Sequence, residues 1–339
     1  MRIVITGGHG FVGSALAAEL VARGRFGGEP IERIVLADKV APSTPRFAGT
    51  DLVETVTGDL APSLSQVFAT PVDVVFHLAA AVSAECERDF DLGMGVNLDT
   101  TRALLDAARH QYEGGGPKVR VVFSSSVAVY GPDPALPMPD LVSESTLPTP
   151  QSSYGAQKYA CETLIADYTR KGFVDGRVVR LMTVAIRPGR PNAAASSFVS
   201  GIIREPLAGL DAPCPVGRDA LLAIASPRTT VRGILTVAEA ERGDQPGQLR
   251  GRLPVNLPAL TVSVGEMLDA LEQVAGADVA ARVHPTPDPM IEALVRSWPA
   301  RFENSRAREL GLRPDAGIAE LIHEYLEDHP DAVTALSPA

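Results

Sequence analysis

The chain has 339 residues, of which 45% are hydrophobic and 21% charged, a composition that excludes disorder as its main state. A formal net charge of −10 would repel a phosphate backbone, so we expect no nucleic-acid partner. The three cysteines, Cys86, Cys161 and Cys214, are far apart and indicate neither a disulfide framework nor a thiolate zinc site.

The apolar run that begins at Ile3 is too short for the core of a secretory signal, and no stretch of 18 apolar residues follows it. We therefore expect a cytoplasmic protein with no membrane partner. His323 and His329 are not at the spacing that places two imidazoles on one helix face, so we expect no metal.

Short apolar, β-branched runs alternate with helical patterns through the first half of the chain. This alternation predicts an α/β fold, a parallel sheet with helices on both faces. Helices are expected from Phe11 to Arg23 and from Thr100 to Ala108, where apolar residues recur at helical spacing. Six runs fit one doubly wound sheet of the Rossmann type: residues 2–6, 33–37, 53–57, 72–78, 119–125 and 177–183.

From about residue 184 the pattern loses this regularity and becomes rich in proline and glycine. We expect a sheet domain of residues 1–183 with a later contribution from about 222–262, and a smaller lobe of residues 184–221 and 263–339. Helices are expected after the capping box of Ser263 and Glu266, after Asn304, and from Ile318 to Glu327.

The first predicted strand runs directly into the glycine-rich sequence TGGHGFVG at residues 6–13, which opens the first predicted helix. Glycines let the backbone turn tightly and bring amide groups close to a pyrophosphate at the helix N-terminus. A glycine-rich turn without a ligand is the alternative, but this context is that of a dinucleotide site. The residues expected to contact the cofactor here are Gly7, Gly10, Phe11, Val12 and Gly13.

Asp38 ends the second predicted strand. A carboxylate there accepts hydrogen bonds from the adenosine ribose and repels a 2′-phosphate, which predicts NAD in preference to NADP. Aspartate is also a common turn residue, and the neighbouring Lys39 would weaken the discrimination, so NADP stays open as the second choice.

Tyr154 and Lys158 are four residues apart and therefore share one face of a helix. A free phenol has a pKa of about 10, and a nearby positive charge lowers that value toward neutrality. Such a pair also arises by chance on exposed helices. Here it follows an apolar strand that ends in the hydroxyls of Ser124 and Ser126, where α/β sheets place their ligands. Ser126 would orient a substrate oxygen while Tyr154 takes its proton.

Six motifs fall in the order of one family: TGGHGFVG, GDL at 58–60, HLAA at 77–80, VNLDTTRALLDAA at 96–108, SSSVAVYG at 124–131 and YGAQK at 154–158. From the first strand to the last helix the chain resembles the extended short-chain dehydrogenases/reductases, the NAD-dependent epimerase/dehydratase family. The resemblance implies an NAD-dependent oxidoreductase with a Rossmann fold. It also implies a homodimer joined through the helices that begin near Asn97 and Tyr154.

The resemblance further implies a role for individual residues. Ser126 would supply the catalytic hydroxyl and Tyr154 the general base, while Lys158 would tune Tyr154 and hold the nicotinamide ribose. Purely structural roles remain open for the three alanines and for Asn97. The cofactor site would also include Asp59 and Leu60 at the adenine, Ala79, Ala80 and Ala81 along the cofactor, Asn97, Ser124, and Val184 at the carboxamide.

Departures from the family pattern point to the substrate. The segment RLMTV at 180–184 stands where the family usually has Arg-Tyr-Phe-Asn-Pro, and the stretch around 222–231 lacks the arginine-aspartate pair of nucleotide-sugar epimerases. The segment RPGRPNAAAS at 187–196 instead concentrates guanidinium and amide donors, which suit a carboxylate. In this it is similar to the D-erythronate dehydrogenase subgroup, which oxidises the C2 hydroxyl of a four-carbon sugar acid.

We therefore expect NAD-dependent oxidation of a small sugar acid, D-erythronate, to its 2-oxo acid. The alternatives are a nucleotide-sugar 4-epimerase or dehydratase with tightly bound NAD, and an NAD-binding scaffold without catalysis. If the arginines of residues 187–196 do not bind substrate, they would lie in surface loops and pair with the acidic exterior. The residues expected to bind substrate are Ser83, Ser126, Tyr154, Arg187, Asn192 and Arg228.

Overall fold

The computed structural model describes residues 1–41, 46–47, 49–189 and 196–335. Its centre is a seven-stranded sheet in the order β12-β8-β7-β6-β1-β4-β5, with every neighbouring pair parallel. The strands of this sheet are β1 (Arg2–Thr6), β4 (Arg33–Asp38), β5 (Val53–Thr57), β6 (Val74–His77), β7 (Arg120–Ser126), β8 (Asp175–Leu181) and β12 (Val255–Asn256).

The order of the strands confirms the predicted doubly wound Rossmann architecture. The chain winds from β1 outward to β4 and β5, then returns to β6 on the other side of β1 and continues through β7 and β8. Ligands bind at such a reversal, outside the carboxyl ends of the strands. All six predicted strands pair in this sheet, and the short strand β12 extends it by one.

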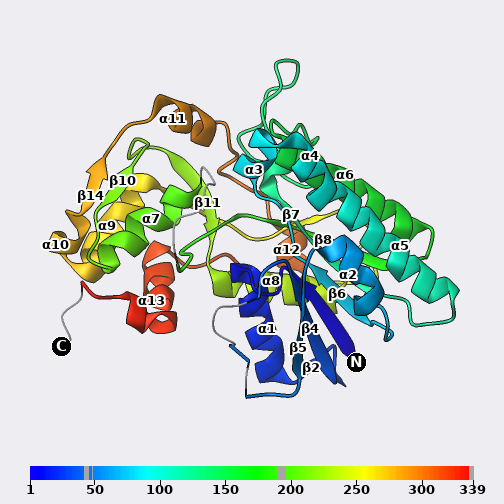
Figure 1. Ribbon diagram of the computed structural model, residues 1–339. Coiled ribbons are helices and arrows are strands. Elements are labelled where there is room, and N and C mark those ends of the chain that lie inside the picture. Colours follow the sequence, from blue (N-terminus) through cyan, green and yellow to red (C-terminus); the bar gives the residue numbers. More distant parts are fainter. Residues whose placement is uncertain (42–45, 48, 190–195, 336–339) are drawn as a thin grey trace.

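Alternation along the strands decides which helices cover each face. In β1, Ile3 and Ile5 point to one face and Val4 to the other, because successive side chains of a strand alternate. The Ile3 face packs against α1 (Phe11–Arg23) and α8 (Pro227–Glu239). The Val4 face packs against α2 (Leu60–Val67), α5 (Thr100–Glu113) and α6 (Ser153–Arg170), which lie on the right of Figure 1.

A second hydrophobic core lies in a separate lobe, on the left of Figure 1. Its main helices are α7 (Ser197–Leu207), α9 (Val264–Ala275) and α13 (Ile318–Asp328), and the expected capping box of Ser263 and Glu266 begins α9. The smaller elements here are β9 (Thr183–Val184), β10 (Ala212–Cys214), β11 (Leu221–Ala225), β13 (Leu260–Ser263), β14 (Val283–Pro285), α10 (Ala277–Ala280) and α11 (Pro289–Arg296).

The two cores divide the chain slightly differently from the expected residue ranges. Strand β11 pairs with β9 and β13 in a small sheet of the second lobe, not in the central sheet. Ala307 and Leu312, near the C-terminus, pack in the first core. The remaining elements are β2 (Arg25–Phe26), β3 (Glu29–Pro30), α3 (Ser83–Arg88), α4 (Phe90–Gly93), the π-helix η1 (Met94–Asp99), the 3₁₀ helices η2 (Val127–Val129) and η3 (Pro330–Ala332), and α12 (Ser305–Glu309).

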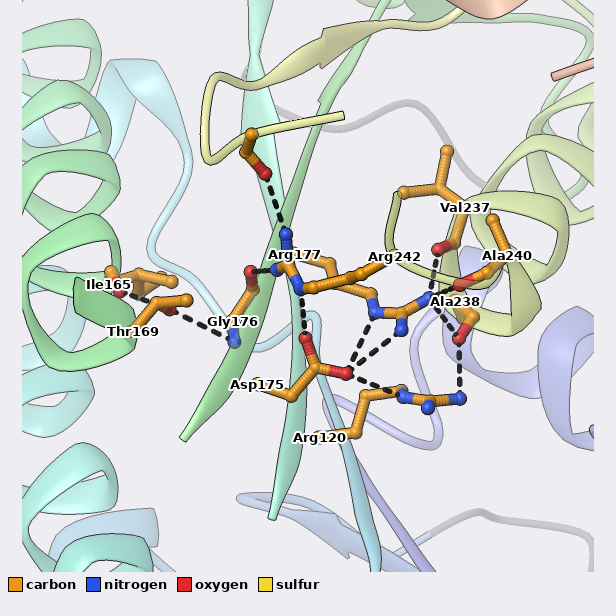
Figure 2. Close-up of polar contacts among 11 residues, drawn as sticks. Arg120, Ile165, Thr169, Asp175, Gly176, Arg177, Val237, Ala238, Ala240 and Arg242 are labelled. Atoms are coloured by element: carbon orange, nitrogen blue, oxygen red, sulfur yellow. Dashed lines mark hydrogen bonds and ion pairs between the residues drawn. The ribbon is translucent and has the colours of Figure 1, made fainter. Parts of the chain in front are cut away.

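A charged cluster connects the end of α8 to the amino ends of β7 and β8 (Figure 2). One carboxylate, that of Asp175, pairs with Arg120 at 3.0 Å, Arg177 at 2.9 Å and Arg242 at 2.6 Å. Arg177 also donates to the carbonyl groups that end α8, those of Val237, Ala238 and Ala240. Burial raises the pKa of Asp175, but the hydrogen bonds and charges of Arg177 and Arg242 outweigh it and hold that pKa at about 2.

No helix in the part of the chain that the structure describes combines the length and the apolar character that a membrane span requires.

Candidate active site

A cavity of about 450 Å³ opens at the carboxyl ends of the central strands, between the two lobes. One side is formed by the glycine-rich turn and the loop after β6: Gly7, Gly10, Phe11, Val12, Gly13, Leu78, Ala80 and Val82. The other side is formed by the ends of β7 and β8, by α6, and by the start of the second lobe: Ser124, Ser125, Ser126, Tyr154, Lys158, Leu181, Met182, Val184, Arg187, Pro188, Ser197, Ser200 and Arg204.

The glycine-rich turn is packed so closely that it admits no side chain at its key positions. A Cβ atom at Gly13 would lie 2.1 Å from the carbonyl oxygen of Gly7, and Gly7 itself has the left-handed φ of +67°. Helix α1 begins at Phe11 without a side-chain cap on its amide groups. These features fit a dinucleotide, because the amide groups of an uncapped helix N-terminus bind a pyrophosphate.

Asp38 stands beside this turn at the end of β4, as predicted. Its carboxylate accepts hydrogen bonds from the amides of His9 at 2.9 Å and Val40 at 3.3 Å. The carbonyl of Asp38 accepts from the amide of Gly58, which brings the predicted adenine contacts Asp59 and Leu60 next to it. Lys39 pairs with Asp59 at 3.3 Å, so its charge is directed away from Asp38.

The three predicted catalytic side chains converge on the cavity. Lys158 is buried, with its ammonium nitrogen 2.9 Å from the carbonyl oxygen of Ser124 and 5.6 Å from the ring centroid of Tyr154. Ser126 accepts a hydrogen bond from the amide of Ala128, which leaves its own proton to donate. Tyr154, Ser126 and Lys158 therefore form one polar group at the carboxyl end of β7.

The electrostatics of Tyr154 differ from the expectation. Burial raises the pKa of Tyr154 to about 12, against the opposing effects of the Ser126 hydroxyl and the Arg187 charge. Burial also lowers the pKa of Lys158 to about 8. The expected lowering of the phenol pKa by Lys158 is thus not found in the protein by itself, because loss of solvation outweighs the Ser126 hydrogen bond and the charge of Arg187.

Two contacts fix α6, which carries Tyr154 and Lys158, against the sheet. A Cβ atom at Gly155 would lie 2.1 Å from the carbonyl oxygen of Ala128, so only glycine allows the helix to approach η2 this closely. One turn beyond Lys158, Glu162 forms a buried two-point ion pair with Arg180 of β8, at 2.6 and 2.8 Å. Neither feature was predicted from the sequence.

The loop after β6 is held by side chains that do not themselves line the cavity. Asn97 accepts from the amide of Ala81 at 2.8 Å and donates to Gln157 at 2.8 Å and to the carbonyl of Ala81. Its side chain therefore holds the loop, the structural role that remained open for Asn97, and it is not among the cavity-lining groups. Its contact with the cofactor stays a prediction. Ala79 donates its amide to Thr6, and Ala80 alone of the three alanines lines the cavity.

His77, also overlooked, lies in a buried row of hydrogen bonds beneath this loop. The hydroxyl of Thr101 donates to the carbonyl of Asn97 at 2.6 Å, so it must accept from Nε2–H of His77 at 2.9 Å. Nδ1 of His77 then accepts from the hydroxyl of Thr6 at 2.7 Å. Burial and the charge of Lys158 lower the pKa of His77 to about 3, so the ring is neutral.

The predicted substrate residues are only partly brought together. Arg187 and Val184 line the cavity, and the Nε of Arg187 donates to the carbonyl of Val184 at 2.9 Å. Ser83 begins α3, next to the cavity-lining Val82 but not in the lining itself. Asn192 lies outside the described residues.

The prediction that Arg228 binds substrate is corrected. Its guanidinium lies on the surface, 43% exposed, and pairs with Asp328 at 2.5 Å and Glu327 at 3.0 Å. Arg228 therefore pairs with the acidic exterior, the alternative that the sequence raised for the arginines of residues 187–196.

One wall of the cavity was not predicted from the sequence. Three polar residues of α7 line it, namely Ser197, Ser200 and Arg204. They are spaced i, i+3 and i+7 in a segment that is mostly apolar, a pattern that places them on one helix face. That spacing was the available signal, but the prolines around residues 188–215 favoured an interpretation as loops.

Comparisons with known proteins agree with this architecture. Residues 3–248 match the NAD dependent epimerase/dehydratase family. The D-erythronate dehydrogenase of Cupriavidus necator is 47% identical to the chain, covering 97% of this chain and 98% of that protein. The D-erythronate dehydrogenase of Haemophilus influenzae is 41% identical, covering 96% and 99%.

Among solved structures, a nucleoside-diphosphate-sugar epimerase from Agrobacterium tumefaciens superimposes with a TM-score of 0.89 at 41% identity, covering 98% of this chain and 95% of that one. The two folds thus correspond over nearly the whole length of both chains. The chain belongs to the NAD-dependent epimerase/dehydratase family.

Proposed function

We propose that the protein oxidises the C2 hydroxyl of D-erythronate to 2-dehydro-D-erythronate with NAD as the oxidant. The observation that carries this proposal is the placement of Ser126, Tyr154 and Lys158 at one end of a cavity whose second-lobe wall carries Arg187. The two D-erythronate dehydrogenases that match over nearly their whole length support the same substrate.

The residues present can divide the work of an alcohol oxidation. Ser126 donates a hydrogen bond to the substrate oxygen, keeps its own proton, and orients the substrate hydroxyl toward Tyr154. Tyr154, as phenolate, takes the hydroxyl proton while the hydrogen on C2 leaves as hydride. NAD, when bound, accepts that hydride, and its cationic ring favours the phenolate. One hydride and one proton leave the alcohol, which becomes the 2-oxo acid.

We propose NAD in preference to NADP because the carboxylate of Asp38 lies at the turn where the adenosine ribose would bind. The cofactor would be held by the amide groups at the start of α1, by the loop around Ala80, and by Lys158 at the nicotinamide ribose. The lobe of residues 184–221 and 263–339 would then hold the substrate, while residues 1–183 and part of 222–262 hold the cofactor.

We further propose a homodimer and a cytoplasmic location. Phe90, Leu92 and Val96 are exposed on α4 and η1, a segment that packs beside α6, and exposed apolar groups of this kind favour association of two copies. The three cysteines are buried and unpaired, which suits a reducing compartment.

The test is the appearance of NADH when the purified protein is mixed with NAD and D-erythronate. Tyr154→Phe should lower kcat by at least about 100-fold, because the proton acceptor is lost, while the affinity for NAD, measured by calorimetry, stays unchanged. No NADH across a panel of four- to six-carbon aldonates would reject the substrate, and full turnover by the Tyr154→Phe variant would reject the base.

A second candidate, a nucleotide-sugar epimerase, is favoured by the match to the epimerase structure from Agrobacterium tumefaciens. Such an enzyme regenerates its bound cofactor in each cycle and releases no NADH. Conversion of a nucleotide sugar to its 4-epimer without net NADH would therefore select this candidate.

A further inference from the structure

Helix α7 carries a polar face that its position in a hydrophobic lobe does not explain. Its residues Val199, Ile202, Ile203 and Leu207 pack in the second core. Ser197, Ser200 and Arg204 instead line the cavity, one helical turn apart from one another. Ser200 accepts a hydrogen bond from the amide of Arg187 at 3.0 Å, which ties this polar face of α7 to the loop that carries Arg187.

Arg204 is the charged member of this face and is only 6% exposed. One nitrogen donates to the carbonyl oxygen of Arg187 at 2.8 Å and another to Glu205 at 2.5 Å. Glu205 is the adjacent residue in the helix, and adjacent residues of a helix do not share a face.

The ion pair between Arg204 and Glu205 is also incomplete. The second carboxylate oxygen of Glu205 is buried without a hydrogen-bond partner among the described residues. Arginine presents its donors as a fork that matches both oxygens of a carboxylate. Glu205 therefore accepts from Arg204 through one carboxylate oxygen, whereas a ligand carboxylate in the cavity could accept through both.

Two guanidinium groups face this part of the cavity, and the carboxylate that pairs with Arg204, that of Glu205, is not among the lining residues. Arg187 and Arg204 both line it, and none of the described lining residues is acidic. Burial lowers the pKa of Arg187, and the charge of Arg204 lowers it further, as expected for like charges held close together. An anion between the two guanidinium groups would offset this repulsion.

The position of the two arginines relative to the catalytic group limits which acids can fit. Arg187 lies near enough to Tyr154 for its charge to favour the phenolate. A carboxylate bound there would be only a short distance from the alcohol that Tyr154 deprotonates. This arrangement fits an acid whose carboxylate is attached to the carbon that is oxidised, a 2-hydroxy acid.

We propose that Arg204 binds the substrate carboxylate together with Arg187 and thereby restricts the enzyme to 2-hydroxy acids. Ser197 and Ser200, on the same helix face, then lie toward the remaining hydroxyls of the substrate. This inference rests on the proposed dehydrogenase function. It adds a specificity-determining residue from a helix that the sequence analysis assigned to loops.

The test compares Arg204→Gln, Arg204→Lys and Glu205→Gln by steady-state kinetics with NAD and D-erythronate, and by calorimetric titration of D-erythronate into the NAD complex. Arg204→Gln should raise KM and the dissociation constant by about 10- to 100-fold, the usual loss for a hydrogen bond to a charged group, with a much smaller change in kcat. Arg204→Lys should recover part of the loss. Glu205→Gln removes the same ion pair but should leave KM unchanged or lower it.

Each outcome decides between the explanations. If Arg204→Gln and Glu205→Gln raise KM equally and lower the melting temperature equally, the pair is structural and the inference is wrong. Unchanged KM in both arginine variants would also overturn it, while the dehydrogenase function would stand. If the unmodified protein neither oxidises nor binds D-erythronate, the proposed function fails first and the inference fails with it.

Discussion

At the scale of single residues, burial is the dominant influence on the ionisable groups around Tyr154. It raises the pKa of the phenol to about 12, lowers that of Lys158 to about 8 and lowers that of His77 to about 3. The phenolate must therefore be stabilised at the moment of reaction, by Ser126 and by positive charge brought to the cavity. A neutral His77 beneath Lys158 avoids a second buried cation at this place.

His77 makes stability depend on pH in a predictable direction. Its pKa is about 3 in the folded protein and 6.5 in the unfolded chain, so between these values only the unfolded chain takes up the proton. Stability should rise with pH through this window, and acidification from pH 7 to pH 5 should remove about 2 kcal/mol. The measurement is urea unfolding at both pH values for the unmodified protein and for His77→Gln, whose loss should be smaller. Equal losses would contradict a buried neutral histidine.

Asp38 is expected to set the choice between NAD and NADP. Asp38→Ala should raise KM for NAD by about 10- to 100-fold, because a carboxylate that accepts from ribose hydroxyls is lost. KM for NADP should fall in the same variant, because the repulsion of its 2′-phosphate is removed. Lys39→Ala is the control, since Lys39 pairs with the exposed Asp59, and it should change neither value appreciably. An unchanged ratio of kcat/KM for the two cofactors in Asp38→Ala would contradict the assignment.

At the scale of elements, the catalytic group depends on how closely α6 approaches the end of β7. The limiting contact is that of Gly155 with the carbonyl of Ala128. Gly155→Ala should push the helix away and lower kcat by up to about 100-fold, since a displacement of about 1 Å is enough for such a loss. Gly317→Ala is the matched control, because Gly317 is extended (φ 178°) and no atom lies within 4 Å of the added Cβ. Equal kcat in both variants would show that the contact does not position Tyr154.

Local patterns predicted those elements whose signals lie within a short window of sequence. The six main strands, the glycine-rich turn before α1 and the pairing of Tyr154 with Lys158 on one helix face all follow from local composition and spacing. Strand β12 was missed because two residues carry no periodicity. Arg228 was misplaced because its partner Asp328 is 100 residues away, and a long-range ion pair leaves no local signal.

At the scale of the whole molecule, the two ends of the central strands differ in function. The cavity lies at the carboxyl ends of the strands. The cluster of Asp175 with Arg120, Arg177 and Arg242 lies at the opposite, amino ends (Figure 2). In that cluster a single carboxylate balances three guanidinium groups. Its contribution to stability is present above pH 4 and is lost as the pH falls toward 2, because the folded pKa lies below the unfolded value of 3.8.

Removing the carboxylate should therefore destabilise the protein without altering catalysis. Asp175→Asn should lower the free energy of unfolding by about 3 kcal/mol, because three arginines are left without a counter-charge. kcat and KM measured well below the melting temperature should not change. Asp244→Asn, which removes an exposed pair with Arg250, should cost less than about 1 kcal/mol. A loss of kcat in Asp175→Asn would show that the two ends of the strands are coupled.

The cavity draws its walls from two hydrophobic cores that are otherwise distinct. A ligand that spans the cavity contacts both lobes. Because such a ligand binds only the native form, the stabilisation it gives grows with the logarithm of its concentration and raises the melting temperature. A dinucleotide and an acid added together should thus shift the heat-induced transition further than either alone. Thermal scanning of compound collections would then identify ternary ligands without any turnover being observed.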